Sequence, residues 1–203
     1  MLSKPMDLTT PVIAILRAAT AKRFAEVTAA LHESGITAVE FTLNSPGALD
    51  ALKECSAAAY PVGAGTVLTA ADAGRAVDAG AAFLITPAVI DEVIAEGRRL
   101  GVPVIPGALT PTEIHHAWVA GATMVKVFPA SAFGPNYLKA VRGPLPEIPL
   151  VPTGGVGIAD AGTYLSAGAR AVGMGSPLIG DALDGGDLNA LRARASELRD
   201  RLS

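Results

Sequence analysis

Short apolar segments alternate with longer Ala-rich segments along most of the chain. The apolar segments are rich in Val and Ile and are bounded by turn residues, so they predict strands. Eight strands are expected, at Val12–Leu16, Ala38–Thr42, Pro61–Ala64, Phe83–Thr86, Val102–Pro106, Met124–Phe128, Leu150–Pro152 and Ala171–Met174. Helices are expected near Ala21–Ser34, Ala48–Ala58, Ala70–Ala79, Asp91–Leu100, Pro111–Ala120, Asn136–Val141, Ala159–Ala167 and Leu188–Leu202, the last of them charged and amphipathic.

The regular alternation of strand and helix predicts an α/β fold. Repeated βαβ crossovers form a parallel sheet, and eight such units close naturally into a (β/α)8 TIM barrel. With 203 residues the barrel would be compact. The chain has no linker, low-complexity tract or shift in composition, so residues 1–203 are expected to form a single domain. An open doubly wound sheet is the rival fold, but no Gly-x-Gly-x-x-Gly motif follows the first strand.

Glycines stand where most of the predicted helices should end. A glycine at this position closes a helix in the left-handed conformation at little cost. The phrase "small residue, Gly, then strand" recurs along the chain and is a weak internal repeat of an αβ unit. It occurs at Gly35, Gly80, Gly101, Gly121 and Gly168.

Composition and charge narrow the classes of function. Half of the residues are hydrophobic, which is enough for a large core, and the net charge of -3 argues against a general nucleic-acid surface. No apolar stretch has the roughly 18 residues of a membrane helix, and Met1–Thr10 lacks the apolar centre of a signal peptide. One cysteine, Cys55, excludes an intrachain disulfide, so a cytoplasmic protein is expected. His115 and His116 point to different sides of a helix, and no metal site is expected.

The candidate chemistry centres on a lysine inside an apolar strand. A lysine stem tolerates burial but its ammonium group does not, so such a residue needs a counter-charge or a reaction to perform. Strand alternation places Met124, Lys126 and Phe128 on one face, with Val125 and Val127 packing under the helices. Lys126 then projects into the barrel. We expect it to be an amine nucleophile that forms a Schiff base with a keto acid, a reaction that needs no cofactor.

A glutamate is expected to face the same interior from the second strand. Glu40 and Thr42 share one face, while Val39 and Phe41 take the outer one. Glu40 is therefore the candidate general acid and base for carbinolamine formation and carbon–carbon cleavage. The alternative is a purely structural buried ion pair between Lys126 and Glu40, although such pairs are weak evidence for stability.

Glycine-bearing turns follow the seventh and eighth strands, where barrels of this type commonly bind phosphate. They contain Gly154, Gly155 and Ser176, which are the candidate phosphate cradle, although glycines here also serve simply as tight turns. Thr66 is a candidate for holding a carboxylate and equally suits a helix N-cap, for which Thr69 is the better candidate. Arg17 either meets a substrate anion or is a solvated residue at the rim.

Six motifs in this order and spacing make the chain similar to a known family. They are Val39-Glu40-Phe41-Thr42-Leu43, Gly63-Ala64-Gly65-Thr66-Val67, Ile85-Thr86-Pro87, Val104-Ile105-Pro106-Gly107, Lys126-Val127-Phe128-Pro129-Ala130 and Pro152-Thr153-Gly154-Gly155-Val156. Together they resemble the class I aldolases acting on 2-keto-3-deoxy-6-phosphogluconate and its relatives, the KDPG/KHG aldolase family. The resemblance covers about Pro11 to Gly180.

The resemblance implies a homotrimeric barrel that cleaves a six-carbon phosphorylated keto acid to pyruvate and glyceraldehyde 3-phosphate. It implies Lys126 as the Schiff-base lysine, Glu40 as the acid and base, and Thr66 as the hydroxyl that holds the pyruvate carboxylate. Gly154, Gly155 and Ser176 would bind the phosphate. The further substrate-binding candidates are Arg17, Asn44, Pro87 and Phe128.

One motif differs from the gluconate-type members of the family. Those enzymes carry Leu-Arg-Thr after the glutamate motif, whereas this chain has Leu43-Asn44-Ser45-Pro46. The Asn version resembles the branch acting on the galactonate epimer, while Pro152-Thr153-Gly154-Gly155 also occurs in gluconate-type members. The epimer at C4, and the use of 4-hydroxy-2-oxoglutarate, therefore stay open. Two other functions also stay open: an isomerase or decarboxylase in which Lys126 is only an electrostatic clamp, and a non-catalytic sugar-phosphate binder.

Overall fold

The computed structural model describes residues 8–202. The ends of the domain predicted over residues 1–203, and most of Met1–Thr10, lie outside the described residues. None of the helices between residues 8 and 202 is both long and apolar enough to cross a lipid bilayer.

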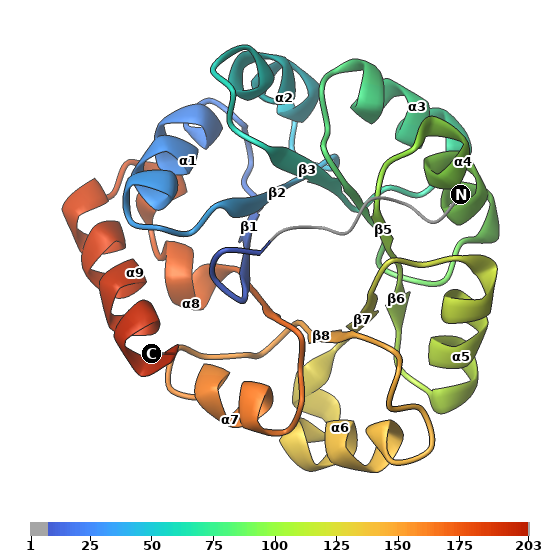
Figure 1. Ribbon diagram of the computed structural model, residues 1–203. Helices are drawn as coiled ribbons and strands as arrows, with labels where there is room; N and C mark the ends of the chain where they lie inside the picture. The colour runs from blue at the N-terminus through green and yellow to red at the C-terminus, as the bar shows by residue number, and fades with distance from the viewer. Residues whose placement is uncertain (1–7, 203) are drawn as a thin grey trace.

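The strands form a curled parallel sheet with helices around its outside (Figure 1). One part has six strands in the order β5-β4-β3-β2-β1-β9, and the other has three in the order β6-β7-β8. A single parallel bridge between Thr153 and Gly173 joins the end of β8 to β9. The strands of residues 8–202 are β1 (Val12–Leu16), β2 (Ala38–Thr42), β3 (Val62–Gly65), β4 (Leu84–Ile85), β5 (Val104–Ile105), β6 (Gly107–Ala108), β7 (Val125–Val127), β8 (Leu150–Pro152) and β9 (Val172–Met174).

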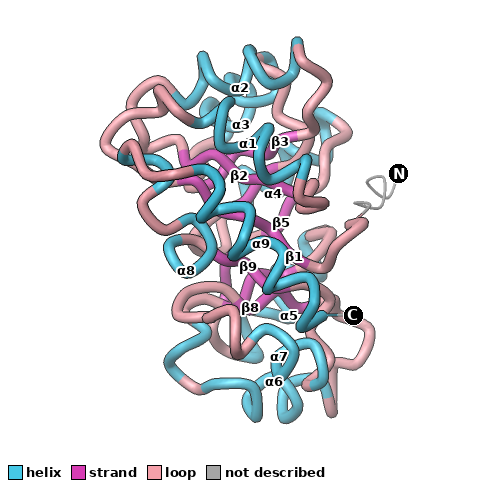
Figure 2. Tube along the Cα trace, turned by 90° about the vertical axis from the view of Figure 1, so that its left-hand side faces the viewer, coloured by secondary structure: helices cyan, strands magenta, loops and turns pink. Residues whose placement is uncertain are grey.

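The helices cover the outer face of this sheet, and Figure 2 shows the strands lying between them. In Figure 1 the C-terminal helix lies beside both the first helix and the seventh, which it also contacts. The α-helices described are α1 (Phe24–Glu33), α2 (Ala48–Ala57), α3 (Ala70–Asp78), α4 (Asp91–Leu100), α5 (Pro111–Ala120), α6 (Gly134–Arg142), α7 (Ala161–Ser166), α8 (Ser176–Ile179) and α9 (Leu188–Leu202). Two short 3-10 helices, η1 (Ala130–Ala132) and η2 (Ala182–Asp184), stand between them.

Two apolar clusters confirm the predicted faces of the strands. The larger cluster packs the outer face of the sheet against the helices and contains Val39, Phe41, Val125 and Val127. The smaller cluster fills the space enclosed by the sheet and contains Met124. Its other members come from nearly every part of the sheet and include Ile13, Ala38, Phe83, Ile85, Ile105, Val151 and Ala171. Residues two positions apart on one strand share a face, so Glu40 and Lys126 face the enclosed side.

The local signals at helix ends are also confirmed. Each of the five glycines predicted to close a helix has a positive φ, between 75° and 108°. The Thr69 side chain accepts a hydrogen bond from the Asp72 amide as the N-cap of α3, so the cap lies where it was expected. At the start of α5, Thr110 and Glu113 form a capping box.

Several predicted boundaries are wrong. The predicted strand Val102–Pro106 ends at Ile105, because Pro106 has no N–H with which to continue the ladder. A further strand that was not predicted, β6, begins at Gly107. Helix α1 begins at Phe24 rather than Ala21, because residues 22 and 23 form a turn after Ala21. Helix α6 is longer than predicted and α7 shorter, and α8 had not been predicted. Its four residues are too few to show a helical period.

Candidate active site

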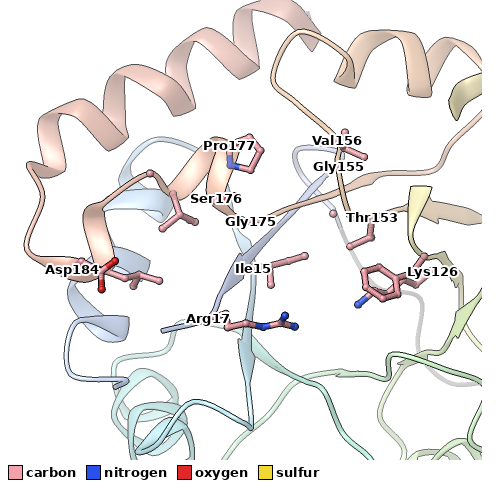
Figure 3. Close-up of a pocket in the computed structure, with 16 residues that line it drawn as sticks. Ile15, Arg17, Lys126, Thr153, Gly155, Val156, Gly175, Ser176, Pro177 and Asp184 are labelled. Atoms are coloured by element: carbon pink, nitrogen blue, oxygen red, sulfur yellow. The ribbon is translucent and has the colours of Figure 1, made fainter. Parts of the chain in front are cut away.

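A cavity of about 400 Å³ opens where β1, β7, β8 and β9 end (Figure 3). Arg17, Phe128, Thr153 and Gly175 each follow directly after one of these strands, so parallel pairing brings them to one end of the sheet. The sequence-predicted residues on its wall are Arg17, Lys126, Phe128, Gly154, Gly155 and Ser176. The wall also includes Ile15, Thr153, Val156, Gly173, Gly175, Pro177, Ile179, Gly180, Leu183 and Asp184.

Lys126 reaches this cavity from the middle of β7. The residue is only 7% exposed, and its strand neighbours are Gly107 on one side and Val151 on the other. Its Nζ lies 4.8 Å from the centroid of the Phe128 ring, a cation–π distance. Phe128 lies two residues further along the same face, so it covers the amine on the side facing solvent.

Glu40 lies deeper, at 1% exposure, on β2. Burial raises the pKa of the Glu40 carboxyl above its ordinary value, and the positive charges of Lys126 and Arg17 act in the opposite direction. A Cβ added at Gly65 would overlap the carboxylate, so the absence of a side chain there makes room for it. A carboxyl whose ionised form is disfavoured by burial and favoured by two nearby cations is suited to taking up and returning a proton.

Glu40 and Lys126 do not form the direct ion pair that was the alternative interpretation of the sequence. Within residues 8–202, no salt bridge of 4.0 Å or less joins the two side chains. The carboxylate instead lies against Gly65, and the amine lies over Phe128. The two groups influence each other through charge without a contact, so a structural ion pair does not explain why Lys126 is buried.

Arg17 lies next to Glu40 because of the strand register. Ile15 pairs with Glu40 across β1 and β2, and Arg17 is two residues beyond Ile15 on the same face. Figure 3 shows the Arg17 side chain extending toward Lys126. The guanidinium makes no hydrogen bond or ion pair within the described chain, so two cations are available to an anionic ligand.

Ser45 is a buried residue near the site that had no predicted role. Its hydroxyl accepts a hydrogen bond from the Ala18 amide at 3.2 Å and lies 3.0 Å from the Thr42 hydroxyl, which in turn donates to the Leu16 carbonyl. The two hydroxyls therefore hold the backbone on both sides of Arg17. A strand-ending Thr followed by Ser three residues later was the available signal.

The glycine turns form the opposite wall of the cavity. Gly154 and Gly155 both have positive φ, and their N–H groups donate no backbone hydrogen bond to any residue between 8 and 202. A Cβ at Gly154 would lie 2.9 Å from the Phe128 ring, and one at Gly155 would lie 2.5 Å from the Ser131 Cβ. Ser176 begins α8 with an exposed side chain. Unpaired amides beside a hydroxyl are suited to binding an anion.

Glu40, Thr66, Asn44 and Pro87 are not on the cavity wall. Thr66 follows β3 with a positive φ of 57°, which is uncommon for a residue other than glycine, and is half-buried. Pro87 follows β4 and is half-buried, with its carbonyl against Gly107. Asn44 is exposed in the turn after β2. Asn44, Thr66 and Pro87 follow the ends of β2, β3 and β4, and therefore lie at the same end of the sheet as the cavity.

The outer wall of the cavity could not be predicted from the sequence. Leu183 and Asp184 line the cavity from η2, at the far end from Lys126, and Figure 3 shows Asp184 beyond Ser176. Neither residue belongs to a motif or to a periodic segment. Ile15 could have been found, because strand alternation places it on the face of Arg17. Among the described residues, no three His, Cys, Asp or Glu side chains are grouped as a metal site would require.

The fold and the cavity together define an α/β protein with a buried lysine at the carboxyl ends of parallel strands. A model of the family described as KDPG and KHG aldolase matches residues 6–193. A relative in Rhizobium meliloti, named probable 2-dehydro-3-deoxy-6-phosphogalactonate aldolase, is 37% identical over 88% of this chain and 86% of its own.

Solved structures support the same family. A structure described as native KDPGal superimposes with a TM-score of 0.90 at 32% identity, covering 98% of this chain and 97% of the other. A KDPG aldolase from Legionella pneumophila, captured with pyruvate as a covalent carbinolamine, gives a TM-score of 0.82 at 29% identity, with 94% of this chain and 95% of the other covered. The chain belongs to the KDPG/KHG aldolase family.

Proposed function

We propose that this protein is a class I aldolase that reversibly cleaves 2-keto-3-deoxy-6-phosphogluconate to pyruvate and D-glyceraldehyde 3-phosphate. The observation that carries the proposal is Lys126, which is 7% exposed, has no carboxylate partner within 4.0 Å among residues 8–202, and faces a cavity of about 400 Å³. A buried amine of this kind is available for reaction with a carbonyl group. The covalent carbinolamine in the Legionella relative supports the same chemistry.

Lys126 is the nucleophile of the reaction. Its Nζ attacks C2 of the keto acid to give a carbinolamine, which loses water to form an iminium ion. The C4 hydroxyl then gives up its proton, the C3–C4 bond breaks, and its electron pair moves toward the iminium nitrogen. Glyceraldehyde 3-phosphate leaves and an enamine of pyruvate remains. Protonation at C3 and addition of water release pyruvate and restore the amine.

Glu40 moves the protons in this sequence. Its carboxylate accepts the proton of the C4 hydroxyl, and the resulting acid returns a proton to C3 of the enamine. The raised pKa of Glu40 suits both roles, because the group must be ionised for one step and protonated for the next. Arg17 and Lys126 keep the carboxyl from being permanently neutral, since both positive charges favour its ionised form.

The ends of the substrate are held by different groups. We assign the pyruvate carboxylate to the Thr66 hydroxyl, with Pro87 and Phe128 bounding the keto-acid end. The phosphate is assigned to the free amides of Gly154 and Gly155 and to the Ser176 hydroxyl. Arg17 and Lys126 also give the cavity a positive field that attracts an anionic substrate.

A second candidate substrate is the C4 epimer, 2-keto-3-deoxy-6-phosphogalactonate. It is favoured by Asn44 after the Glu40 motif and by the likeness to proteins named for that substrate. The smaller acid 4-hydroxy-2-oxoglutarate is a further alternative. Release of pyruvate from each purified compound, coupled to lactate dehydrogenase, tests the proposal and ranks the substrates. No turnover with any of the three would contradict aldolase function and favour a binding protein.

We further propose that the two parts of the sheet act as one closed (β/α)8 barrel in a single domain with α9 packed on its outside. The Thr153–Gly173 bridge supports closure on one side, and the adjacency of β5 and β6 in the chain supports it on the other. The homotrimer implied by the family resemblance and the cytoplasmic location expected from the single cysteine stay predictions. Nucleic-acid, membrane and metal partners play no part in the proposed reaction, which also needs no cofactor.

A further inference from the structure

Helix α8, on the cavity wall, depends on contacts with other elements for its stability. It has only four residues, Ser176–Ile179, and its first residue is the serine assigned to the phosphate. A single helical turn is not stable by itself in water, because fixing it costs more backbone entropy than its few hydrogen bonds return. Something outside α8 must therefore hold it in place. Figure 1 shows α8 lying between α9 and the strands.

Arg194 of α9 reaches across and binds the end of α8. Its Nε donates a hydrogen bond to the Leu178 carbonyl at 2.7 Å, and its Nη2 donates one to the Ile179 carbonyl at 2.8 Å. The last carbonyl groups of a helix have no partner within the helix and carry partial negative charge. A planar guanidinium satisfies two of them with one rigid group.

The surroundings of Arg194 show that its charge serves this contact. Within residues 8–202 no ion pair involves Arg194, whereas Arg192 on the same helix pairs with Glu33. Gly180, directly after α8, leaves space for the guanidinium, since a Cβ there would lie 2.5 Å from the Arg194 Nη2. The contact is also local to α8, because no described hydrogen bond of Arg194 goes elsewhere.

We propose that Arg194 is a positioning residue for the phosphate end of the site: by fixing the end of α8, it fixes Ser176 on the cavity wall. This inference rests on the proposed phosphate site. The Lys126 end of the cavity is built on β7 and has no contact with Arg194. Loss of Arg194 should therefore weaken binding of a phosphorylated substrate and leave the chemistry at Lys126 unchanged.

The test compares two substrates in the full-length protein. In Arg194→Met, we expect the KM for the phosphorylated keto acid to rise about tenfold with little change in kcat. The KM for the same keto acid without its phosphate should stay the same. Arg194→Lys can reach only one carbonyl and should give an intermediate KM. Arg192→Met, which removes an exposed ion pair of the same helix, is the matched control and should behave as wild type.

Two outcomes for Arg194→Met would contradict the inference. If Arg194→Met lost activity equally on both substrates, or kept the wild-type KM for the phosphorylated one, Arg194 would be a purely structural or a neutral residue. If Arg194→Met did not fold, Arg194→Lys would decide by the same comparison. A wild-type enzyme with equal KM values for both substrates would overturn the phosphate site itself, and the inference with it, which separates that failure from failure of the Arg194 contact alone.

Discussion

The two ends of the candidate active site are built in different ways. At one end, Lys126 and Glu40 are side chains in the middle of strands, 7% and 1% exposed, and the sheet fixes them on both sides. At the other end, Gly154, Gly155 and Ser176 lie in turns and at the start of a four-residue helix, and they are half-buried or exposed. The chemistry is assigned to strands, and the recognition of the phosphate to loops.

Because of this difference, substitutions at the two ends should affect the kinetics differently. A strand residue that pairs on both sides has one position and one face, so a change at Lys126 or Glu40 should alter the rate of the chemical step. In the proposed phosphate site, loop residues contribute backbone amides and one hydroxyl, and several of them share one anion. Changes there should alter KM more than kcat, and by smaller factors.

Replacing Lys126 should have the largest effect. Lys126→Arg keeps a positive charge but cannot form an imine, so we expect kcat to fall by at least about 10⁴-fold. Pyruvate release from the phosphorylated keto acid measures the loss, and circular dichroism checks the fold. A variant that kept most of its activity would show that Lys126 is only an electrostatic clamp, as in an isomerase or decarboxylase.

Replacing Glu40 should have the next largest effect, with kcat lower by about 10²–10⁴-fold in Glu40→Gln.

The same substitution should raise the stability of the folded protein, although it lowers kcat. Because burial raises the pKa of Glu40, the folded protein binds a proton more tightly than the unfolded chain, and wild-type stability falls as pH rises from about 4.5 through the folded-state pKa. Glu40→Gln should therefore melt at a higher temperature than wild type at pH 8, with the difference shrinking at pH 4. A lower melting temperature at pH 8 would contradict the raised pKa.

A substitution at Gly65 tests whether the position of the Glu40 carboxylate matters for the rate as much as its presence does. A Cβ at Gly65 would overlap the Glu40 carboxylate, so Gly65→Ala should displace it. Misplacement of a catalytic group by about 1 Å costs roughly 10²-fold in rate, and we expect a loss of kcat of that order. Gly74→Ala, at a glycine of α3 where the added Cβ would lie 4.0 Å from the Glu96 Oε1, controls for glycine replacement. Equal kcat in the two variants would contradict the close fit.

The smallest effect is expected at the loop end. Ser176→Ala removes one of several groups assigned to the phosphate, so KM for the phosphorylated substrate should rise about tenfold or less, with kcat nearly unchanged. Steady-state kinetics with and without the phosphate group on the substrate measure the change. A fall in kcat with constant KM would place Ser176 in the chemical step and remove the contrast between the two ends.

The same contrast explains what the sequence could predict. Alternation along β2 and β7 correctly placed Glu40 and Lys126 on the enclosed face, because a period of two leaves only one alternative. It could not predict that the two groups would stay apart, since that depends on the space above Gly65 and on the Phe128 ring. Pro177 and Ile179 of α8 and Asp184 of η2 carry no period and no motif, so only the three-dimensional structure brings them to the cavity.

The most direct test of the central claim is reduction with borohydride in the presence of pyruvate, followed by peptide mass spectrometry. We expect a single pyruvate-derived mass on the peptide containing Lys126, and none in Lys126→Arg. Labelling of another lysine, or no labelling of the active wild-type protein, would contradict a Schiff base on Lys126.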